Sequence, residues 1–355
     1  MKSVQKKYIV LMVAVLFVAT VVSAKSKERL PKDITPTILK SSGYSSIVMH
    51  ADNGTVLYEK NAKQVRYPAS LTKMMTLYLT FEALQKRKIK MHQKLRVSRL
   101  AALQPKSKLY LRKGQRISVQ DATLGLIIKS ANDAAVVLSE AIGGSNKKFV
   151  ALMNDKARRL GMNNTRFQNP HGLHNPQQYT TAKDMAILAV ALRRDFKKYY
   201  HLFSRKHFVY KGRTIYTHNH VVARYRWVDG LKTGYINASG YNLATSARKN
   251  GTKLVAIVMG GQTAYIRDKH MVELLQSGYA QLNRQKNIRI AKVSSKKSVK
   301  KKKLKTISNT SNSVFSVVDA NKLKRNVKDI KLANRHLLEI KSVDKTQGCW
   351  NVLQN

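Results

Sequence analysis

Three short segments of this chain carry side chains that together suit serine acyl transfer. In chain order they are Ser70-Leu71-Thr72-Lys73, Ser130-Ala131-Asn132 and Lys232-Thr233-Gly234. A serine hydroxyl is a poor nucleophile until a base takes its proton. At helical spacing, a lysine three residues after a serine lies on the same face, one turn away. The residue types and their order therefore predict a nucleophilic serine served by lysine bases.

The first segment depends on its surroundings, because a serine three residues before a lysine recurs in this lysine-rich chain. The same spacing occurs at Ser3, Ser145, Ser294, Ser298 and Ser342. Ser70 differs because Pro68 and Ala69 precede it and a long apolar run follows it. In so apolar a helix, burial and a nearby Lys232 both disfavour the protonated form of Lys73. We therefore expect a neutral Lys73 to act as the base for Ser70.

The second segment offers a proton relay and a polar amide. Ser130 and Asn132 fall in a loop between two predicted helices, where they can reach a cleft. Ser130 can pass a proton between Lys73 and the leaving group, while Asn132 can hydrogen-bond a substrate amide. The alternative is an ordinary N-cap for a helix over residues 133–142. The presence of the other two segments favours the functional interpretation.

The third segment places a cation, a hydroxyl and a glycine at the end of a strand. Lys232 and Thr233 suit a substrate carboxylate, while Gly234 lets the backbone pass close to the nucleophile. The backbone N–H groups of Ser70 and Tyr235 would then form an oxyanion hole. The alternative is a solvated strand end, which would explain Gly234 but not its combination with Lys232 and Thr233.

The histidines and the single cysteine carry less weight. His218 and His220 could form a metal pair or a base, but no third ligand is near in sequence, so we interpret them as substrate contacts or plain surface. His171 is interpreted as a fixture of its loop. Cys349 cannot form an internal disulfide, and no Cys or His cluster has zinc-ligand spacing. We expect no metal and no cofactor.

The N-terminus predicts export. Residues 1–24 combine three early lysines, an apolar stretch from Tyr8 to Val22 and a small-residue end at Ala24, which is the pattern of a signal peptide. An uncleaved membrane anchor is the alternative, although the apolar stretch is short for a span of roughly 20 residues. We expect the protein in the periplasm or cell envelope, with the inner membrane surface as one location.

The chain is strongly basic, with 67 Lys and Arg against 18 Asp and Glu and a formal charge of +49. Such a charge ordinarily indicates nucleic acid, but export and the lack of a recognisable nucleic-acid module argue against that partner. Residues 286–355 hold 18 Lys or Arg against 4 acids, a net of +14, which leaves +35 upstream. The partners we expect are anionic envelope surfaces, meaning lipid head groups and acidic wall polymers.

The secondary structure that must position the three segments is predicted to run from strands to helices, back to strands and then to a final helix. Strand patterns around an Asp-Asn-Gly turn predict a hairpin over 45–59. A helix over 70–86 is apolar nearly all round, so it must be buried at the centre of its domain. After a helical block, strands return at 208–216, 228–233, 241–247 and 254–259, followed by a helix at about 267–282. This order predicts an α+β fold, an antiparallel sheet flanked by helices with an inserted all-helical subdomain.

We place a catalytic domain over residues 25–285 and a basic linker and tail over 286–355. Seven lysines fall between residues 296 and 305, a composition that predicts linker or disorder. Apolar residues recur at helical spacing within 321–341. A basic amphipathic helix on a membrane surface and a short helix packed on the main domain are both open.

The chain resembles the low-molecular-mass penicillin-binding proteins, which are serine-type D-Ala-D-Ala carboxypeptidases with a β-lactamase/transpeptidase-like fold. The similarity runs from about residue 45 to residue 279 and includes, in family order, the segments 67–76, 129–134, 169–173, 228–234 and 239–243. The resemblance implies removal of the last D-alanine from a peptidoglycan pentapeptide, through an acyl-enzyme that water hydrolyses. It also implies acylation by penicillin and other β-lactam antibiotics.

The resemblance assigns a role to each site residue. It implies Ser70 as the acylated nucleophile, Lys73 as the base, Ser130 as the proton shuttle, Asn132 as a substrate-positioning amide, and Lys232 with Thr233 as the pocket for the terminal carboxylate. Many relatives have a histidine where this chain has Tyr235, a change that is tolerable if only the backbone amide is used. Relatives often place an arginine near 218–220, so carboxylate binding here should lean on Lys232 and Thr233.

Three other functions are alternatives to the carboxypeptidase activity. A β-lactamase needs rapid deacylation, normally from a glutamate, and this chain has no glutamate between Ala141 and Lys232. Slow release of penicillin is therefore predicted. Endopeptidase action on peptidoglycan cross-links uses the same chemistry and stays open. A non-enzymatic envelope-binding protein driven by charge is the third alternative.

Overall fold

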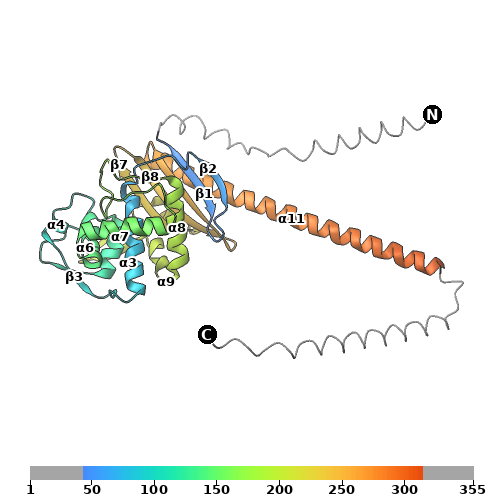
Figure 1. The fold of residues 1–355 in the computed structure, drawn as a ribbon, viewed down its shortest axis with the longest axis horizontal. Coiled ribbons are helices and arrows are strands. Elements are labelled where there is room, and N and C mark those ends of the chain that lie inside the picture. The colour runs from blue at the N-terminus through green and yellow to red at the C-terminus, as the bar shows by residue number, and fades with distance from the viewer. Residues whose placement is uncertain (1–42, 315–355) are drawn as a thin grey trace, which may run out of the picture. The chain divides into compact units, whose positions relative to one another are not determined.

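The computed structural model describes residues 43–314. Its centre is a five-stranded antiparallel sheet of strand order β2-β1-β9-β8-β7 (Figure 1). The strands are β1 (Ser45–His50), β2 (Val56–Lys60), β7 (Val228–Ile236), β8 (Gly240–Lys249) and β9 (Thr252–Gly261). Because β1 pairs with β9, the predicted N-terminal hairpin and the late strands form one sheet, with β7 at its edge.

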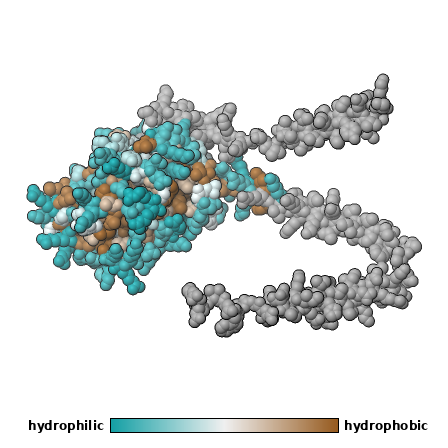
Figure 2. Space-filling view, viewed as in Figure 1, coloured by the Kyte–Doolittle hydropathy of each residue, from teal (hydrophilic) through white to brown (hydrophobic). Residues whose placement is uncertain are grey.

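Side chains alternate between the two faces of the sheet along each strand, and helices cover both faces, so both are buried. Ile47 and Ile257 belong to the core shared with the helical region, while Val48 and Val258 belong to a second core on the opposite face. Met271 of the last helix packs in that second core. Apolar residues therefore gather in two cores, and the face seen in Figure 2 is mainly hydrophilic with hydrophobic residues in scattered patches.

The helical region is built around α3 (Lys73–Gln85), which continues from the 3-10 turn η1 (Ala69–Thr72). Nearly all side chains of α3 are buried, as the apolar sequence predicts. Helix α8 (Ala182–Asp195) packs between α3 and the sheet strands β1, β8 and β9. The remaining helices are α4 (Arg99–Ala102), α5 (Val119–Leu124), the π-helical turn η2 (Gly125–Lys129), α6 (Asn132–Gly143), α7 (Asn146–Arg159), α9 (Lys197–Tyr200), η3 (His201–Ser204) and α10 (His220–Arg224).

Two local predictions are corrected. The inserted subdomain is not all helical, because β3 (Lys94–Arg96) pairs with β4 (Arg116–Ser118) inside it. The strand predicted over 208–216 is instead a hairpin of β5 (His207–Tyr210) and β6 (Arg213–Tyr216), which forms a sheet of its own. Its turn at Lys211 and Gly212 has positive φ at both residues, the geometry of a tight hairpin.

The last helix is longer than predicted, since α11 runs Ala264–Val314. No Gly or Pro interrupts residues 279–314, and lysine has a good helix propensity, so the helix continues through the stretch expected to be a linker. The chain divides into two units after Asn283. Every helix between residues 43 and 314 is too short or too polar to cross a lipid bilayer. The predicted signal peptide over 1–24 and the segment 321–341 lie outside the described residues.

Candidate active site

The three chemical segments meet at one cavity of about 260 Å³. It opens between η1, the junction of η2 with α6, and the edge strand β7. The predicted site residues that line it are Ser70, Ser130, Asn132, Thr233, Gly234 and Tyr235. Residues far apart in sequence are therefore brought together as the segments predict.

Ser70 sits in a strained turn that its neighbours hold in place. Ala69 has a φ of 47°, a left-handed conformation that costs a non-glycine residue about 1 to 2 kcal/mol. The loop containing Gly172 packs directly on this turn, and a Cβ at Gly172 would lie 1.9 Å from the Ala69 carbonyl oxygen. Only glycine fits there, so the 169–173 loop is a support for the nucleophile.

Gly234 brings β7 against the backbone N–H groups of the same turn. A Cβ at Gly234 would lie 3.1 Å from the Ser70 nitrogen and 3.2 Å from the Leu71 nitrogen. A larger residue would push the strand away from these donors. The close approach of β7 therefore requires glycine at position 234, as the sequence suggested. It also brings the edge strand next to the Ser70 N–H group, as an oxyanion hole requires.

Lys73 is fully buried, at 0% exposed, and three oxygen atoms surround its amine. Its Nζ lies 3.0 Å from Ser70 Oγ, 2.7 Å from Asn132 Oδ1 and 2.5 Å from the carbonyl oxygen of His171. Burial, and after it the charge of Lys232, lower the pKa of Lys73 well below its ordinary value, while Asp133 opposes the shift. The surroundings of this amine therefore disfavour its protonated form.

These contacts give a neutral Lys73 a defined direction. The amide oxygen of Asn132 and the carbonyl of His171 can only accept hydrogen bonds, so they take the two N–H groups of a neutral amine. The remaining contact is Ser70 Oγ at 3.0 Å, and a hydroxyl can donate. The lone pair of Lys73 therefore faces the proton that must leave Ser70.

The loop between η2 and α6 supplies Ser130 and Asn132. Ser130 has a φ of 60° and lines the cavity with Ser70. The Asn132 side-chain amide donates to the carbonyl of Pro105 at 3.0 Å while its oxygen accepts from Lys73. Asn132 thus orients Lys73, a contact that the sequence interpretation, which gave it only a substrate amide, did not include.

Lys232 occupies a different place from the one expected. It is 1% exposed, its Nζ donates to the carbonyl of Thr233 at 2.8 Å, and it is not among the residues that line the cavity. Burial, and after it the charge of Arg267, lower the pKa of Lys232 to about 7. Lys232 therefore lies behind the cavity wall, and its effect in this structure is electrostatic, through the pKa of Lys73.

Arg267, in the first turn of α11, is a site residue that sequence reasoning missed. It is buried yet lines the same cavity as Thr233, and its guanidinium donates to the carbonyl of Asn242 at 3.3 Å and to Asp268 Oδ1 at 2.7 Å. A fork of N–H donors suits a carboxylate. The expectation that carboxylate binding leans on Lys232 and Thr233 stays a prediction, and Arg267 is a further candidate for that contact. No local pattern shows that an arginine in a helix turns toward a distant strand.

Two histidines near the site, His171 and His218, have lowered pKa values. Burial, and after it Lys232, lower the pKa of His218, which lines the cavity, to about 4. Burial and then Lys73 lower the pKa of His171 to about 3. The His171 ring accepts from the Leu173 N–H at 3.2 Å, as a loop fixture does. Within residues 43–314, no three His, Cys, Asp or Glu side chains are grouped closely enough to hold a metal ion.

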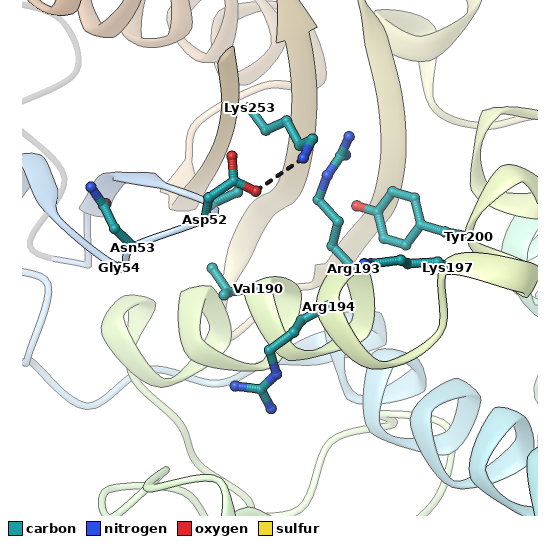
Figure 3. A pocket seen from close by; sticks show the side chains of 10 residues that line it. Asp52, Asn53, Gly54, Val190, Arg193, Arg194, Lys197, Tyr200 and Lys253 are labelled. Atoms are coloured by element: carbon teal, nitrogen blue, oxygen red, sulfur yellow. Dashed lines mark hydrogen bonds and ion pairs between the residues drawn. The ribbon is translucent and has the colours of Figure 1, made fainter. Parts of the chain in front are cut away.

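A larger cavity, of about 640 Å³, lies elsewhere, against α8 (Figure 3). Lys253 and Asp52 form an ion pair of 3.0 Å at its wall, drawn as a dashed line in Figure 3. Arg193 of α8, also in its wall, contacts Asp229 of β7 at 2.8 Å. The cavity has no serine in its wall. The Arg193–Asp229 pair joins α8 to β7, and the Lys253–Asp52 pair joins β9 to the turn that follows β1.

The fold and the site define a serine acyl-transfer enzyme of the transpeptidase-like class. Comparison with protein families narrows this class, because the profile described as D-alanyl-D-alanine carboxypeptidase, peptidase family S11, matches residues 33–263. The chain belongs to this family. The predictions of the family and of a serine-type carboxypeptidase are confirmed.

Curated relatives and solved structures agree with this assignment. D-alanyl-D-alanine carboxypeptidase DacF of Bacillus subtilis is 37% identical over 80% of this chain and 75% of its own length. DacC of Escherichia coli is 38% identical over 66% of this chain and 60% of its own length. Penicillin-binding protein 5 of Haemophilus influenzae, 36% identical, superposes with a TM-score of 0.65 over 68% of this chain and 72% of its own. The predicted fold class is confirmed.

Proposed function

We propose that this protein removes the terminal D-alanine from peptidoglycan pentapeptides, with Ser70 as the acylated nucleophile and Lys73 as its base. The observation that carries the proposal is the buried Lys73 amine, whose Nζ lies 3.0 Å from Ser70 Oγ. The similarity to relatives named D-alanyl-D-alanine carboxypeptidase supports the choice of substrate.

Acylation uses the residues around the cavity in turn. Lys73 takes the hydroxyl proton as Ser70 Oγ bonds to the carbonyl carbon of the penultimate D-alanine. The backbone N–H groups of Ser70 and Tyr235 stabilise the oxyanion. The C–N bond then breaks, and Ser130 passes the proton from Lys73 to the leaving amine. The carboxylate of the departing D-alanine lies against Thr233 and Arg267, and water afterwards hydrolyses the ester on Ser70.

The same serine would react with β-lactam antibiotics. Penicillin-binding protein D2 of Listeria monocytogenes, 31% identical to this chain with a TM-score of 0.61 over 66% of it and 96% of its own length, was solved in an ampicillin-bound form. Since this chain has no glutamate between Ala141 and Lys232, the penicilloyl ester on Ser70 should persist for long after it forms.

We also propose that the protein works in the periplasm or cell envelope. The signal-like residues 1–24 support export. The 18 Lys and Arg within residues 286–355 support contact with an anionic surface, such as the inner membrane.

Mass spectrometry of the purified protein tests the proposal. We expect D-alanine release from a pentapeptide and a penicillin adduct on the peptide that contains Ser70, both abolished by Ser70→Ala. Ser145→Ala is the matched control, since Ser145 also precedes a lysine by three residues but caps α7; it should keep full activity. An adduct on any other peptide would overturn the assignment of Ser70. Equal wall binding by wild type and Ser70→Ala, with no hydrolysis by either, would favour the non-enzymatic alternative.

A further inference from the structure

Asp133 is a buried carboxylate that the proposed reaction does not use. It is the second residue of α6, directly after Asn132, and it is 0% exposed. No lysine, arginine or histidine among residues 43–314 forms an ion pair with it. A carboxylate is costly to bury unless hydrogen bonds replace its contacts with water. The groups that donate to Asp133 therefore indicate what this residue holds in place.

Two donors to Asp133 are backbone N–H groups of the loop over residues 105–111. The nitrogen of Leu109 lies 3.0 Å from both carboxylate oxygens, and the nitrogen of Leu111 lies 3.1 Å from Oδ2. Between them, Tyr110 has a φ of 59°, a left-handed conformation that is unfavourable for a residue with a Cβ. The two hydrogen bonds to one carboxylate compensate for this strain, so Asp133 fixes the shape of the loop.

The other end of the same loop holds Asn132. The side-chain amide of Asn132 donates to the carbonyl of Pro105 at 3.0 Å and to that of Lys106 at 3.3 Å. Its backbone N–H donates to the carbonyl of Ser107 at 2.7 Å. With its N–H groups held in this way, the amide oxygen of Asn132 lies 2.7 Å from Lys73 Nζ. A displaced loop would therefore turn this oxygen away from the amine.

Asp133 also affects the charge of the same amine. Burial, and after it the charge of Lys232 of β7, lower the pKa of Lys73, while Asp133 opposes that shift. His171 of the 169–173 loop also faces Lys73, and burial and then Lys73 lower the pKa of that histidine to about 3. Lys232 and Asp133 therefore shift the pKa of Lys73 in opposite directions.

We propose that Asp133 is a positioning residue for the base of the reaction, acting on Lys73 through the 105–111 loop and Asn132. The contacts form one path, from the carboxylate to the loop N–H groups, from the loop carbonyls to Asn132, and from Asn132 to Lys73. Asp133 does not line the active-site cavity, so it is not a catalytic residue. The inference rests on the proposed function, because it concerns how the base of that reaction is held.

The test is Asp133→Asn in the full chain. The amide keeps the size of the side chain, but it has one acceptor oxygen and brings an NH₂ group against the N–H donors of the loop. We expect the rate constant of penicillin acylation at Ser70 to fall at least about tenfold, while the dissociation constant of the noncovalent penicillin complex stays within about twofold of wild type. Loss of the negative charge beside Lys73 should also move the acid limb of the pH–rate profile to lower pH. Stopped-flow acylation between pH 5 and 10 measures all three.

Asp184→Asn is the matched control. Asp184 is also a buried carboxylate in the first turn of a helix, α8, and it accepts hydrogen bonds from the Asn164 N–H at 2.9 Å and the Thr165 hydroxyl at 2.7 Å. This variant should lose melting temperature as Asp133→Asn does, but it should keep the acylation rate and the pH profile of wild type. Equal losses of rate in the two variants, or a wild-type rate in Asp133→Asn, would overturn the inference.

An Asn132→Ala background tests the path itself. If Asp133 acts through Asn132, adding Asp133→Asn to Asn132→Ala should lower the acylation rate by less than about a further twofold. A full second loss of about tenfold would show that Asp133 acts by another route and would overturn the path.

Tyr110→Gly provides a rescue, because glycine adopts a positive φ without strain. Added to Asp133→Asn, it should restore part of the acylation rate and leave the pH profile shifted. Failure of Asp133→Asn to fold both with and without Tyr110→Gly would show that Asp133 is only structural and would overturn the inference. Wild type that forms no penicillin adduct on Ser70 would overturn the proposed function, and this inference with it.

Discussion

The active-site cavity and the larger cavity of Figure 3 both have basic side chains in or behind their walls. The two sites differ in whether those side chains have carboxylate partners. In the larger cavity, Arg193 and Lys253 each pair with a carboxylate. At the active site, Lys73 and Lys232 are fully buried, and neither has a carboxylate within ion-pair distance among the described residues.

Cavity volume therefore does not identify the active site of this protein. A paired cation keeps its proton and contributes to holding elements together, whereas a buried cation without a partner loses its proton and becomes a base. The smaller cavity of about 260 Å³ contains the nucleophile, and the larger one of about 640 Å³ contains structural ion pairs. Substituting one basic residue at a time separates the two roles.

The largest effect is expected from Lys73→Met. Removal of the general base should lower kcat/KM for penicillin acylation by about a thousandfold. Because the amine has no carboxylate partner to strand, the free energy of unfolding should change by less than about 1 kcal/mol. Stopped-flow acylation and urea unfolding measure the two quantities. A variant that loses several kcal/mol of stability would show that Lys73 is structural.

Arg193→Met should give the reverse result. Its side chain is 14% exposed and that of its partner Asp229 is 28% exposed, so the stranded carboxylate should cost about 2 kcal/mol of unfolding free energy. Acylation should stay within about twofold of wild type. The matched control is Arg194→Met, whose side chain is 65% exposed and whose loss should cost less than about 0.5 kcal/mol. Loss of acylation in Arg193→Met would contradict the purely structural role of the ion pair between Arg193 and Asp229.

Lys232→Met should change how the stability and the acylation rate depend on pH. The pKa of Lys232 is about 7 in the folded protein, below its ordinary 10.5, so between these values the unfolded chain binds more protons. The contribution of Lys232 to the stability of wild type should therefore decrease as the pH falls from 10.5 toward 7, and Lys232→Met should remove this part of the pH dependence. Loss of its positive charge also raises the pKa of Lys73, which moves the acid limb of acylation to higher pH. Unchanged slopes in chemical unfolding from pH 6 to 10 would contradict this electrostatic role.

Apart from the control Arg194→Met, Lys253→Met should change the protein least. Its ion pair with Asp52 is largely solvated, with side chains 36% and 52% exposed, so the loss should be under about 1 kcal/mol. Acylation should be unchanged. A drop in the melting temperature as large as that of Arg193→Met would mean that the pairs around the larger cavity act as one network.

Local sequence rules were enough for the centre of the site. The Ser70 to Lys73 contact follows from helical spacing, the low pKa of Lys73 from an apolar helix, and the strand approach from Gly234. The antiparallel sheet with flanking helices followed from the order of strand and helix patterns. These features depend on neighbours in sequence or on the type of residue alone.

Features set by tertiary packing were out of reach. Arg267 lines the cavity because the start of α11 packs on the sheet face that holds Val48 and Val258, and a helix pattern does not show which side chain turns toward a distant strand. The position of Lys232 behind the wall follows from the alternation along β7 once its pairing is known. The continuation of α11 beyond residue 282 was missed because a lysine-rich composition was given more weight than the absence of Gly and Pro.

The role of Lys73 as a base, which follows from its burial without a carboxylate partner, can be tested by the pH dependence of penicillin acylation at Ser70. The rate of adduct formation would be followed by intact-protein mass spectrometry between pH 5 and 11. We expect the rate to fall on the acid side at a pH well below the value near 10.4 at which a lysine in water titrates, and we expect Lys73→Met to lose this dependence. An acid limb near 10, or a wild-type profile retained by Lys73→Met, would contradict it.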